Sequence, residues 1–210
     1  MKERGMIFNG EMTRAILDGR KTQTRRPVRF PVLDKNLGCE LAGNELAGEL
    51  SAGNYLNSAF GRPGDRIWVR ETFCPVDDTQ YGGEKWVDYR ATPKFEASHP
   101  AGWDCAPNDA EALKWRPSIH MPRWASRILL EITNVRVERL NAISQEDAQA
   151  EGMELTGWRP TYSDPDSGGE VMTPYDNFAE LWSSIYGDES WKANGWVWVI
   201  SFKRVEGGAA

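Results

Sequence analysis

The last long apolar stretch of the chain, residues 195–202, places hydrophobic side chains on both faces of the strand that its residue types predict. Such a strand has to be covered on two sides, because either bare face would leave aromatic and branched side chains in water. A chain of 210 residues, 40% of them hydrophobic, is long enough to provide that cover. We therefore expect a single domain in which this stretch is a core strand that closes the sheet.

Three other segments carry the signals of helix ends. Asn9 is a suitable N-cap for a short amphipathic helix that Gly19 would end. Ser144 begins a second helix, with an acid at the third helical position and Gly152 as its stop. Thr173 begins the clearest helix, which has proline at its first position and one apolar face.

Segments of β type lie between these helices, at residues 6–8, 66–73, 86–91 and 127–140. The inward side of the last segment switches between Ile132 and Val135, which indicates a bulge or strong coiling. Strands and helices do not alternate regularly, so a doubly wound parallel sheet is disfavoured. The pattern predicts an α+β fold and favours a small β-barrel with flanking helices.

Three stretches rich in glycine or polar residues interrupt these elements, at residues 34–60, 75–115 and 156–172. The first contains a short near-repeat, but two copies of this length cannot stack into a core. We therefore interpret all three as loop-like insertions in one domain that spans residues 1–206.

Charge is distributed unevenly along the chain, whose net charge is -6. Residues 1–29 hold eight Lys or Arg and three Asp or Glu, a net charge of +5. Residues 141–190 hold one Arg and eleven Asp or Glu, a net charge of -10. The overall acidity argues against non-specific binding of duplex nucleic acid, and the unevenness indicates a polar seam or one face for an anionic partner.

The reactive and metal-ligating residue types are scarce. The three cysteines, Cys39, Cys74 and Cys105, are widely spaced, and His99 and His120 are the two histidines. Neither a disulfide framework nor a zinc site is expected from this spacing, so we predict no metal and no cofactor. The sequence also has no run of about 18 apolar residues and no leader signal, which predicts a cytoplasmic protein without a membrane partner.

The residues from Arg20 to Arg29 include five Lys or Arg and no acid. Lys21 and Thr24 lie three residues apart in this run, after the first predicted helix. A lysine that loses its proton can activate a hydroxyl, and neighbouring arginines together with burial favour the neutral amine. Taken alone, the pattern is more typical of a solvated or phosphate-binding turn than of a catalytic site.

Several of the ten tryptophans adjoin basic residues. Trp68 lies near Arg70 and Trp124 follows Arg123, an interleaving that suits the stacking of a nucleobase. Most of the tryptophans are better explained as core residues, among them Trp182 and Trp198. His120 is better explained as a hydrogen-bonded structural residue than as a catalyst.

Four motifs in this order resemble the ASCH domain, at residues 16–26, 63–69, 144–152 and 196–202. The ASCH family is similar to PUA domains, small β-barrels with flanking helices that are related to RNA-binding modules. With residues 120–127 included, the chain resembles the long ASCH proteins common in bacteriophages and prophages. The resemblance covers most of the chain outside the three insertions.

The resemblance implies an activity, since small bacterial relatives of this type remove the acyl group from N4-acetylcytidine. Their lysine base and threonine nucleophile match Lys21 and Thr24, and their glutamate proton donor matches Glu151. Arg26 matches a basic position in the same segment. The implied partner is a small modified nucleoside.

Four further residues are candidates for substrate binding: Trp68, Arg70, Glu71 and Trp124. Arg70 and Glu71 would hold the Watson–Crick edge of the base, and the two tryptophans would stack on it. The alternative is an RNA-binding module of the PUA-like type, with or without ribonuclease activity, that uses the basic segment to hold phosphate. A third possibility is an accessory protein whose site has lost its chemistry.

Overall fold

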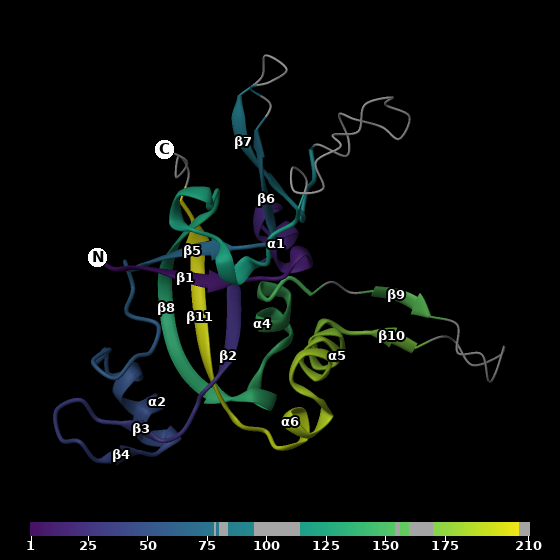
Figure 1. Cartoon of the computed structure of the whole chain (residues 1–210). Coiled ribbons are helices and arrows are strands. Elements are labelled where there is room, and N and C mark those ends of the chain that lie inside the picture. The colour runs from purple at the N-terminus through teal and green to yellow at the C-terminus, as the bar shows by residue number, and fades with distance from the viewer. Residues whose placement is uncertain (78, 80–83, 95–113, 154–155, 160–169, 206–210) are drawn as a thin grey trace. The chain divides into compact units, whose positions relative to one another are not determined.

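The computed structural model describes residues 1–77, 79, 84–94, 114–153, 156–159 and 170–205, which form an α+β arrangement (Figure 1). The helices are α1 (Gly10–Leu17), α2 (Gly43–Ser51), α4 (Gln145–Ala150), α5 (Pro174–Tyr186) and α6 (Asp188–Lys192), with 3-10 turns η2 (Ser118–His120), η3 (Arg123–Ala125) and η4 (Leu140–Ala142). The strands are β1 (Glu3–Ile7), β2 (Gln23–Pro27), β3 (Val32–Leu33), β4 (Glu40–Leu41), β5 (Arg66–Arg70), β6 (Phe73–Asp77), β7 (Lys85–Tyr89), β8 (Leu129–Arg139), β9 (Thr156–Arg159), β10 (Glu170–Met172) and β11 (Trp196–Arg204). Among the described residues, no helix has the length and apolar character needed to cross a membrane.

The main sheet has the hydrogen-bonded order β1-β5-β8-β11-β2. Strand β1 runs parallel to β5, whereas β2 runs antiparallel to β11, so the sheet is mixed. Three two-stranded ladders accompany it: β3 with β4, β6 with β7, and β9 with β10. The predicted α+β class is confirmed. Closure into a barrel is not found among the described strands, and so it stays a prediction.

The chain divides into two compact units. The first comprises Met1–Asp18, Arg66–Leu130 and Arg204–Ala210, and the second comprises Gly19–Asp65 and Glu131–Lys203. The first unit therefore holds α1, β1 and β5 to β7. The second holds β2, most of β8 and β11, and the helices α2, α4, α5 and α6.

In the first unit, the predicted strand at residues 66–73 is split into β5 and the start of β6. Alternate residues of this segment are buried, with exposed fractions of 0% for Ile67, 1% for Val69, 2% for Glu71 and 1% for Phe73. Helix α1 begins where predicted, because the Asn9 side chain accepts a hydrogen bond from the Met12 N–H at 2.8 Å. Gly19, just after the helix, has a positive φ of 77°, a conformation that favours glycine.

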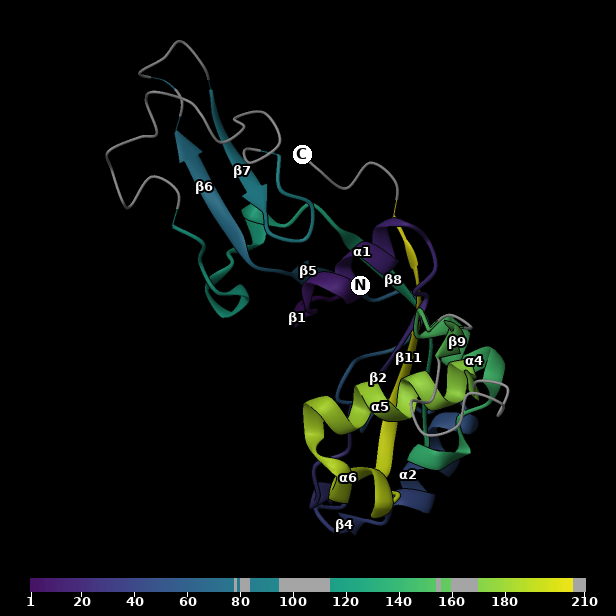
Figure 2. The same ribbon diagram turned by 90° about the vertical axis from the view of Figure 1, so that its right-hand side faces the viewer.

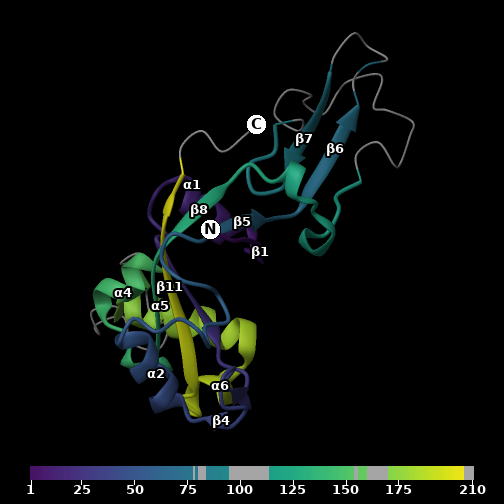
Figure 3. The same ribbon diagram turned by 90° about the vertical axis from the view of Figure 1, so that its left-hand side faces the viewer.

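In the second unit, β11 is buried on both faces, as its composition predicts. Val197 and Val199 pack in one cluster with Phe178 and Trp182 of α5. On the opposite face, the Trp198 ring meets the Phe60 ring edge-on with centroids 5.8 Å apart. Figure 2 shows α5 in front of β11, and Figure 3, from the other side, shows α2 in front of it. The two faces are therefore covered by different segments, α5 and the 34–60 stretch.

The 34–60 stretch is more ordered than the loop-like insertion we predicted, because it contains α2. Leu46 and Leu50 are one helical turn apart and are both buried, at 0% and 3% exposed. The Ala42 N–H at the start of the helix donates to Glu45 Oε2 at 2.8 Å. Two apolar residues at helical spacing were enough for a helix here, although Gly43 and Gly48 lower its intrinsic propensity. Parts of the other two predicted insertions lie outside the described residues.

Two further expectations concern strands of the second unit. The inward side of β8 does switch: Ile132 is buried, Thr133 and Asn134 are both exposed, and Val135 is buried again. The predicted turn around Thr24 is wrong, because residues 23–27 form strand β2. Pairing with β11 explains the difference, since it provides hydrogen-bond partners that a free basic turn would lack.

Helix α2 provides a test of the packing against β11. A Cβ added at Gly43 would lie 2.3 Å from atoms of the Trp196 ring, so Gly43→Ala forces that ring to move. We expect a loss of about 1–3 kcal/mol in the free energy of unfolding, measured by urea denaturation. The matched control is Gly48→Ala in the same helix, where nothing lies within 4 Å, and we expect it to stabilise the protein by about 0.5–1 kcal/mol. Equal effects of the two changes would contradict this packing.

Candidate active site

The start of β2 and the end of α4 are joined through their backbones. Lys21 and Glu151 form an isolated antiparallel bridge, and the Thr22 N–H donates to the Ala150 carbonyl at 2.8 Å. Helix α4 ends here because Glu151 is its C-cap and Gly152 follows with a positive φ of 92°. These two segments, about 130 residues apart in the sequence, are thereby held side by side. Both belong to the second unit.

The side chains of Lys21 and Glu151 are in direct contact. Lys21 Nζ donates to Glu151 Oε2 at 2.6 Å and to the Glu151 backbone carbonyl at 2.9 Å. Both residues are buried, with exposed fractions of 2% and 3%. Burial lowers the pKa of Lys21 below its ordinary value, and although the Glu151 carboxylate opposes this, Arg26 and Arg25 lower the pKa further. The net result is an amine that gives up its proton more readily than a solvated lysine does.

Thr24 lies in β2 opposite Ile200 of β11 and is 1% exposed. Strand alternation places its side chain on the same face as Arg26 and on the face opposite to Gln23 and Arg25. Within the described part of the chain, both hydrogen bonds of Lys21 Nζ go to Glu151, and neither goes to Thr24. The structure thus brings Lys21 and Glu151 together and buries Thr24 three residues further along the same segment.

A second group of charged side chains surrounds this pair and was not singled out from the sequence. Arg25 Nη1 donates to Glu151 Oε1 at 3.2 Å, while its Nη2 donates to Glu138 Oε1 at 2.7 Å and to Asp147 Oδ2 at 2.9 Å. Gln23 Nε2 donates to Asp147 Oδ1 at 3.0 Å. One feature of the sequence could have indicated this charged group: Asp147 and Glu151 are four residues apart in a predicted helix and therefore share a face.

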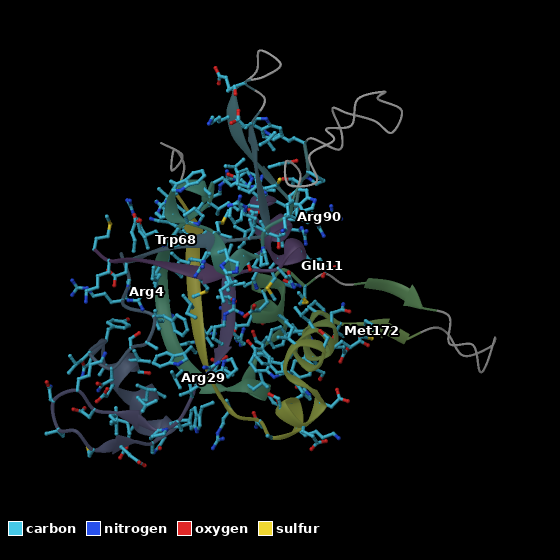
Figure 4. All side chains as sticks on the ribbon, viewed as in Figure 1. Arg4, Glu11, Arg29, Trp68, Arg90 and Met172 are labelled. Atoms are coloured by element: carbon cyan, nitrogen blue, oxygen red, sulfur yellow. The ribbon has the colours of Figure 1, made fainter. Side chains whose placement is uncertain are left out.

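The remaining predicted substrate-binding residues, apart from Arg26 on β2, belong to the first unit. Trp68 is on β5 (Figure 4), and the guanidinium of Arg70 lies 5.4 Å from the centre of its ring. Both carboxylate oxygens of Glu71 accept hydrogen bonds from Arg127, at 2.9 and 3.0 Å, so this side chain already has partners. Trp124 is 70% exposed. These contacts are all internal to the first unit.

No group of three or more His, Cys, Asp or Glu side chains is arranged to hold a metal ion in the part of the chain that the structure describes. Cys39 is exposed and Cys74 is buried, and neither forms a disulfide within the described part of the chain. Cys105 and His99 lie outside the described residues, and His120 is exposed in η2.

Comparisons of this chain with known protein families, with curated proteins and with solved structures found no match. A function has therefore to be argued from the residues of the site.

The buried pair predicts a specific pattern of stability changes. Lys21→Met or Glu151→Gln alone leaves a buried polar group without its partner, and we expect each to cost about 3–5 kcal/mol of unfolding free energy. The double variant should cost less than the sum, because neither partner is then stranded. Urea denaturation of the four proteins measures this coupling.

The control is the ion pair between Lys203 and Glu131, whose side chains are 63% and 31% exposed and 2.9 Å apart. Its removal by Lys203→Met should change stability by about 1 kcal/mol or less, because solvent screens an exposed pair. If the losses of unfolding free energy at Lys21 and Glu151 simply add in the double variant, the contact between the two side chains does not stabilise the protein.

Proposed function

We propose that this protein is an amidohydrolase that removes the acyl group from N4-acylated cytidine, with Lys21, Thr24 and Glu151 as its catalytic residues. The observation that supports this most is the buried contact between Lys21 Nζ and Glu151 Oε2, at 2.6 Å, which adjoins the segment that carries Thr24. It agrees with the roles that the resemblance to ASCH proteins implies. A PUA-like barrel and membership of the ASCH family are part of the same proposal.

Lys21 and Glu151 act as one unit that holds a single proton. With the proton on the amine, the pair is an ammonium and a carboxylate; with the proton on the carboxyl, it is a neutral amine and an acid. Burial penalises the charged form, which is the reason the pKa of Lys21 is lowered. The neutral form is the active one, because it contains a base and an acid at the same time.

In the first half of the reaction, the neutral Lys21 amine takes the proton of the Thr24 hydroxyl. The Thr24 oxygen attacks the acyl carbon of the amide, and Arg26 stabilises the charge that develops on the acyl oxygen. Glu151 gives its proton to N4 as the C–N bond breaks. Cytidine leaves, Thr24 carries the acyl group as an ester, and the pair is now an ammonium and a carboxylate.

The second half reverses these proton transfers. The Glu151 carboxylate takes a proton from water, which attacks the ester carbonyl. The Lys21 ammonium returns its proton to the Thr24 oxygen as the ester C–O bond breaks. The acid product is released and the neutral pair is restored, so the cycle needs no further proton donor or acceptor.

This chemistry requires the Lys21 amine to reach the Thr24 hydroxyl, which strand alternation places on the face of β2 opposite to Arg25, the side chain that contacts Glu151. Among the described strands, β2 is the last in the order of the main sheet, and the end of α4 lies beside the segment just before it. Arg26, on the same face as Thr24, and Arg25 both lower the pKa of Lys21, which favours the neutral amine. In the proposed reaction Lys21 Nζ exchanges one of its two contacts with Glu151 for one to the Thr24 hydroxyl.

The burial of these three residues, each at most 3% exposed, favours a small substrate over an RNA strand. The alternative is an RNA-binding module of the PUA-like type, with or without ribonuclease activity, that uses the basic segment from Arg20 to Arg29 to hold phosphate. Two measurements on the same protein distinguish these functions. Turnover of N4-acetylcytidine is followed by the ultraviolet spectrum, and binding of oligoribonucleotides is followed by its dependence on salt concentration.

We expect the wild-type protein to convert N4-acetylcytidine to cytidine. Thr24→Ala should abolish turnover, and Lys21→Ala and Glu151→Gln should each lower kcat by about 100-fold or more, because each removes one proton-transfer group. The matched control is Thr22→Ala, an exposed hydroxyl two residues away, which should leave kcat unchanged. A wild type that binds RNA and turns over no acylcytidine would refute the proposal.

The pH dependence follows from the shared proton. Activity is lost at the alkaline end, when the pair loses the single proton that Lys21 and Glu151 share. Because burial lowers the pKa of Lys21 from 10.5, the alkaline limb of kcat/KM should fall below that value. A rate that keeps rising with pH would show instead that the amine acts as a base without an acid partner.

A further inference from the structure

Arg25 is the most highly connected side chain next to the Lys21–Glu151 pair. Its side chain is 1% exposed, and its two terminal nitrogens contact three carboxylates, those of Glu151, Glu138 and Asp147. Arg25 Nη1 also donates to Gln23 Oε1 at 2.5 Å, and its guanidinium lies 5.7 Å from the centre of the Phe178 ring. A buried arginine with this many partners has one orientation available to it.

Glu138 and Asp147 are themselves held by a second arginine. Arg136 Nε donates to Glu138 Oε2 at 2.9 Å, and Arg136 Nη2 donates to Asp147 Oδ2 at 2.6 Å. The four side chains thus form a closed ring in which each arginine contacts both carboxylates. The ring joins β2, β8 and α4, and the pKa of Asp147 is lowered despite partial burial because Gln23 and both arginines stabilise its carboxylate.

Glu151 needs such a support. Its backbone is fixed by the bridge to Lys21, but its carboxyl group can rotate about the side-chain bonds. Arg25 contacts Oε1 and Lys21 contacts Oε2, so each oxygen of the Glu151 carboxyl group has its own partner. Loss of the Oε1 contact would free the carboxylate to turn away from the amine.

We propose that Arg25 is a positioning residue: anchored by Glu138 and Asp147, it holds Glu151 Oε1 so that Oε2 stays on the Lys21 amine. This inference rests on the proposed function for its catalytic meaning, but the positioning itself can be measured without activity. Arg25 points away from the Thr24 face of β2 and does not bind the substrate. Its contribution is therefore to the geometry and proton affinity of the pair.

The test compares Arg25→Gln with Arg136→Gln. Both changes break the ring, but only the first removes the contact to Glu151. We expect Arg25→Gln to lower kcat by about 100-fold while KM stays within about twofold, because the pair is misplaced and substrate contacts are intact. Arg136→Gln should leave kcat within about threefold of the wild type.

The pH profile separates positioning from a general loss of stability. Among the described residues, the charged groups around the pair include Arg25 and Arg26 of β2, Asp147 of α4 and Glu138 of β8. Arg20, before β2, donates to the Gly152 carbonyl. Since Arg25 lowers the pKa of Lys21, its removal should move the alkaline limb of kcat to higher pH. Arg136→Gln should leave the limb where it is.

A readout independent of catalysis is the titration of the Lys21 side chain, followed by carbon-13 NMR and assigned with Lys21→Arg. If the wild type hydrolyses no acylcytidine but Arg25→Gln still shifts this titration upward, the proposed function fails and the positioning role stands. If the wild type is active and Arg25→Gln matches it in kcat, alkaline limb and titration, the positioning role is overturned.

Should Arg25→Gln fail to fold, Arg25→Lys keeps the charge but offers a single amino group that cannot reach all three carboxylates. We expect it to lower kcat with a smaller shift of the alkaline limb, since it restores charge and not geometry. Full kcat in Arg25→Lys would show that charge alone matters and would contradict the positioning role.

Discussion

The contact between the Lys21 amine and the Glu151 carboxylate governs the arrangement of the second unit around it. Neither group could be buried alone without a large cost in solvation free energy, so each requires the other. Their contact in turn requires the end of α4 to lie against the start of β2, which the backbone bridge and the Thr22 hydrogen bond achieve. The same burial that makes the pair costly also lowers the pKa of Lys21, so the amine holds its proton less tightly.

The sheet provides the rigid support that such a pair needs. Strand β11 is packed on one face by α5 and on the other by the stretch that contains α2, and β2 is paired to it along residues 23–27. Arg25 continues this support into the charged network, because its guanidinium lies near the Phe178 ring of the core while its nitrogens hold three carboxylates. Arg25 thus links the Lys21–Glu151 pair to the core.

Local signals predicted the helix ends and the strand faces. Asn9 and Ser144 cap helices as expected. The change of the inward-facing side of β8 between Ile132 and Val135 was visible in the alternation of apolar and polar residues. Helix α2 was missed because its glycines obscured two leucines at helical spacing. The charged ring was missed for a different reason: its members come from β2, β8 and α4, and only tertiary packing decides that these segments meet. Spacing could suggest Lys21 and Thr24, but Glu151 entered through a resemblance, and its contact with Lys21 became visible in the structure.

The most direct test of the central claim is mass spectrometry of the protein after brief exposure to N4-acetylcytidine and quenching in acid, which preserves esters. If the Lys21–Glu151 pair activates Thr24, one acetyl group should be found on Thr24 and none on Thr22, and Thr24→Ala should carry none at all. Turnover of the substrate without an acetyl group on Thr24, or with the group on Lys21 instead, would contradict the claim that the buried pair serves a threonine nucleophile.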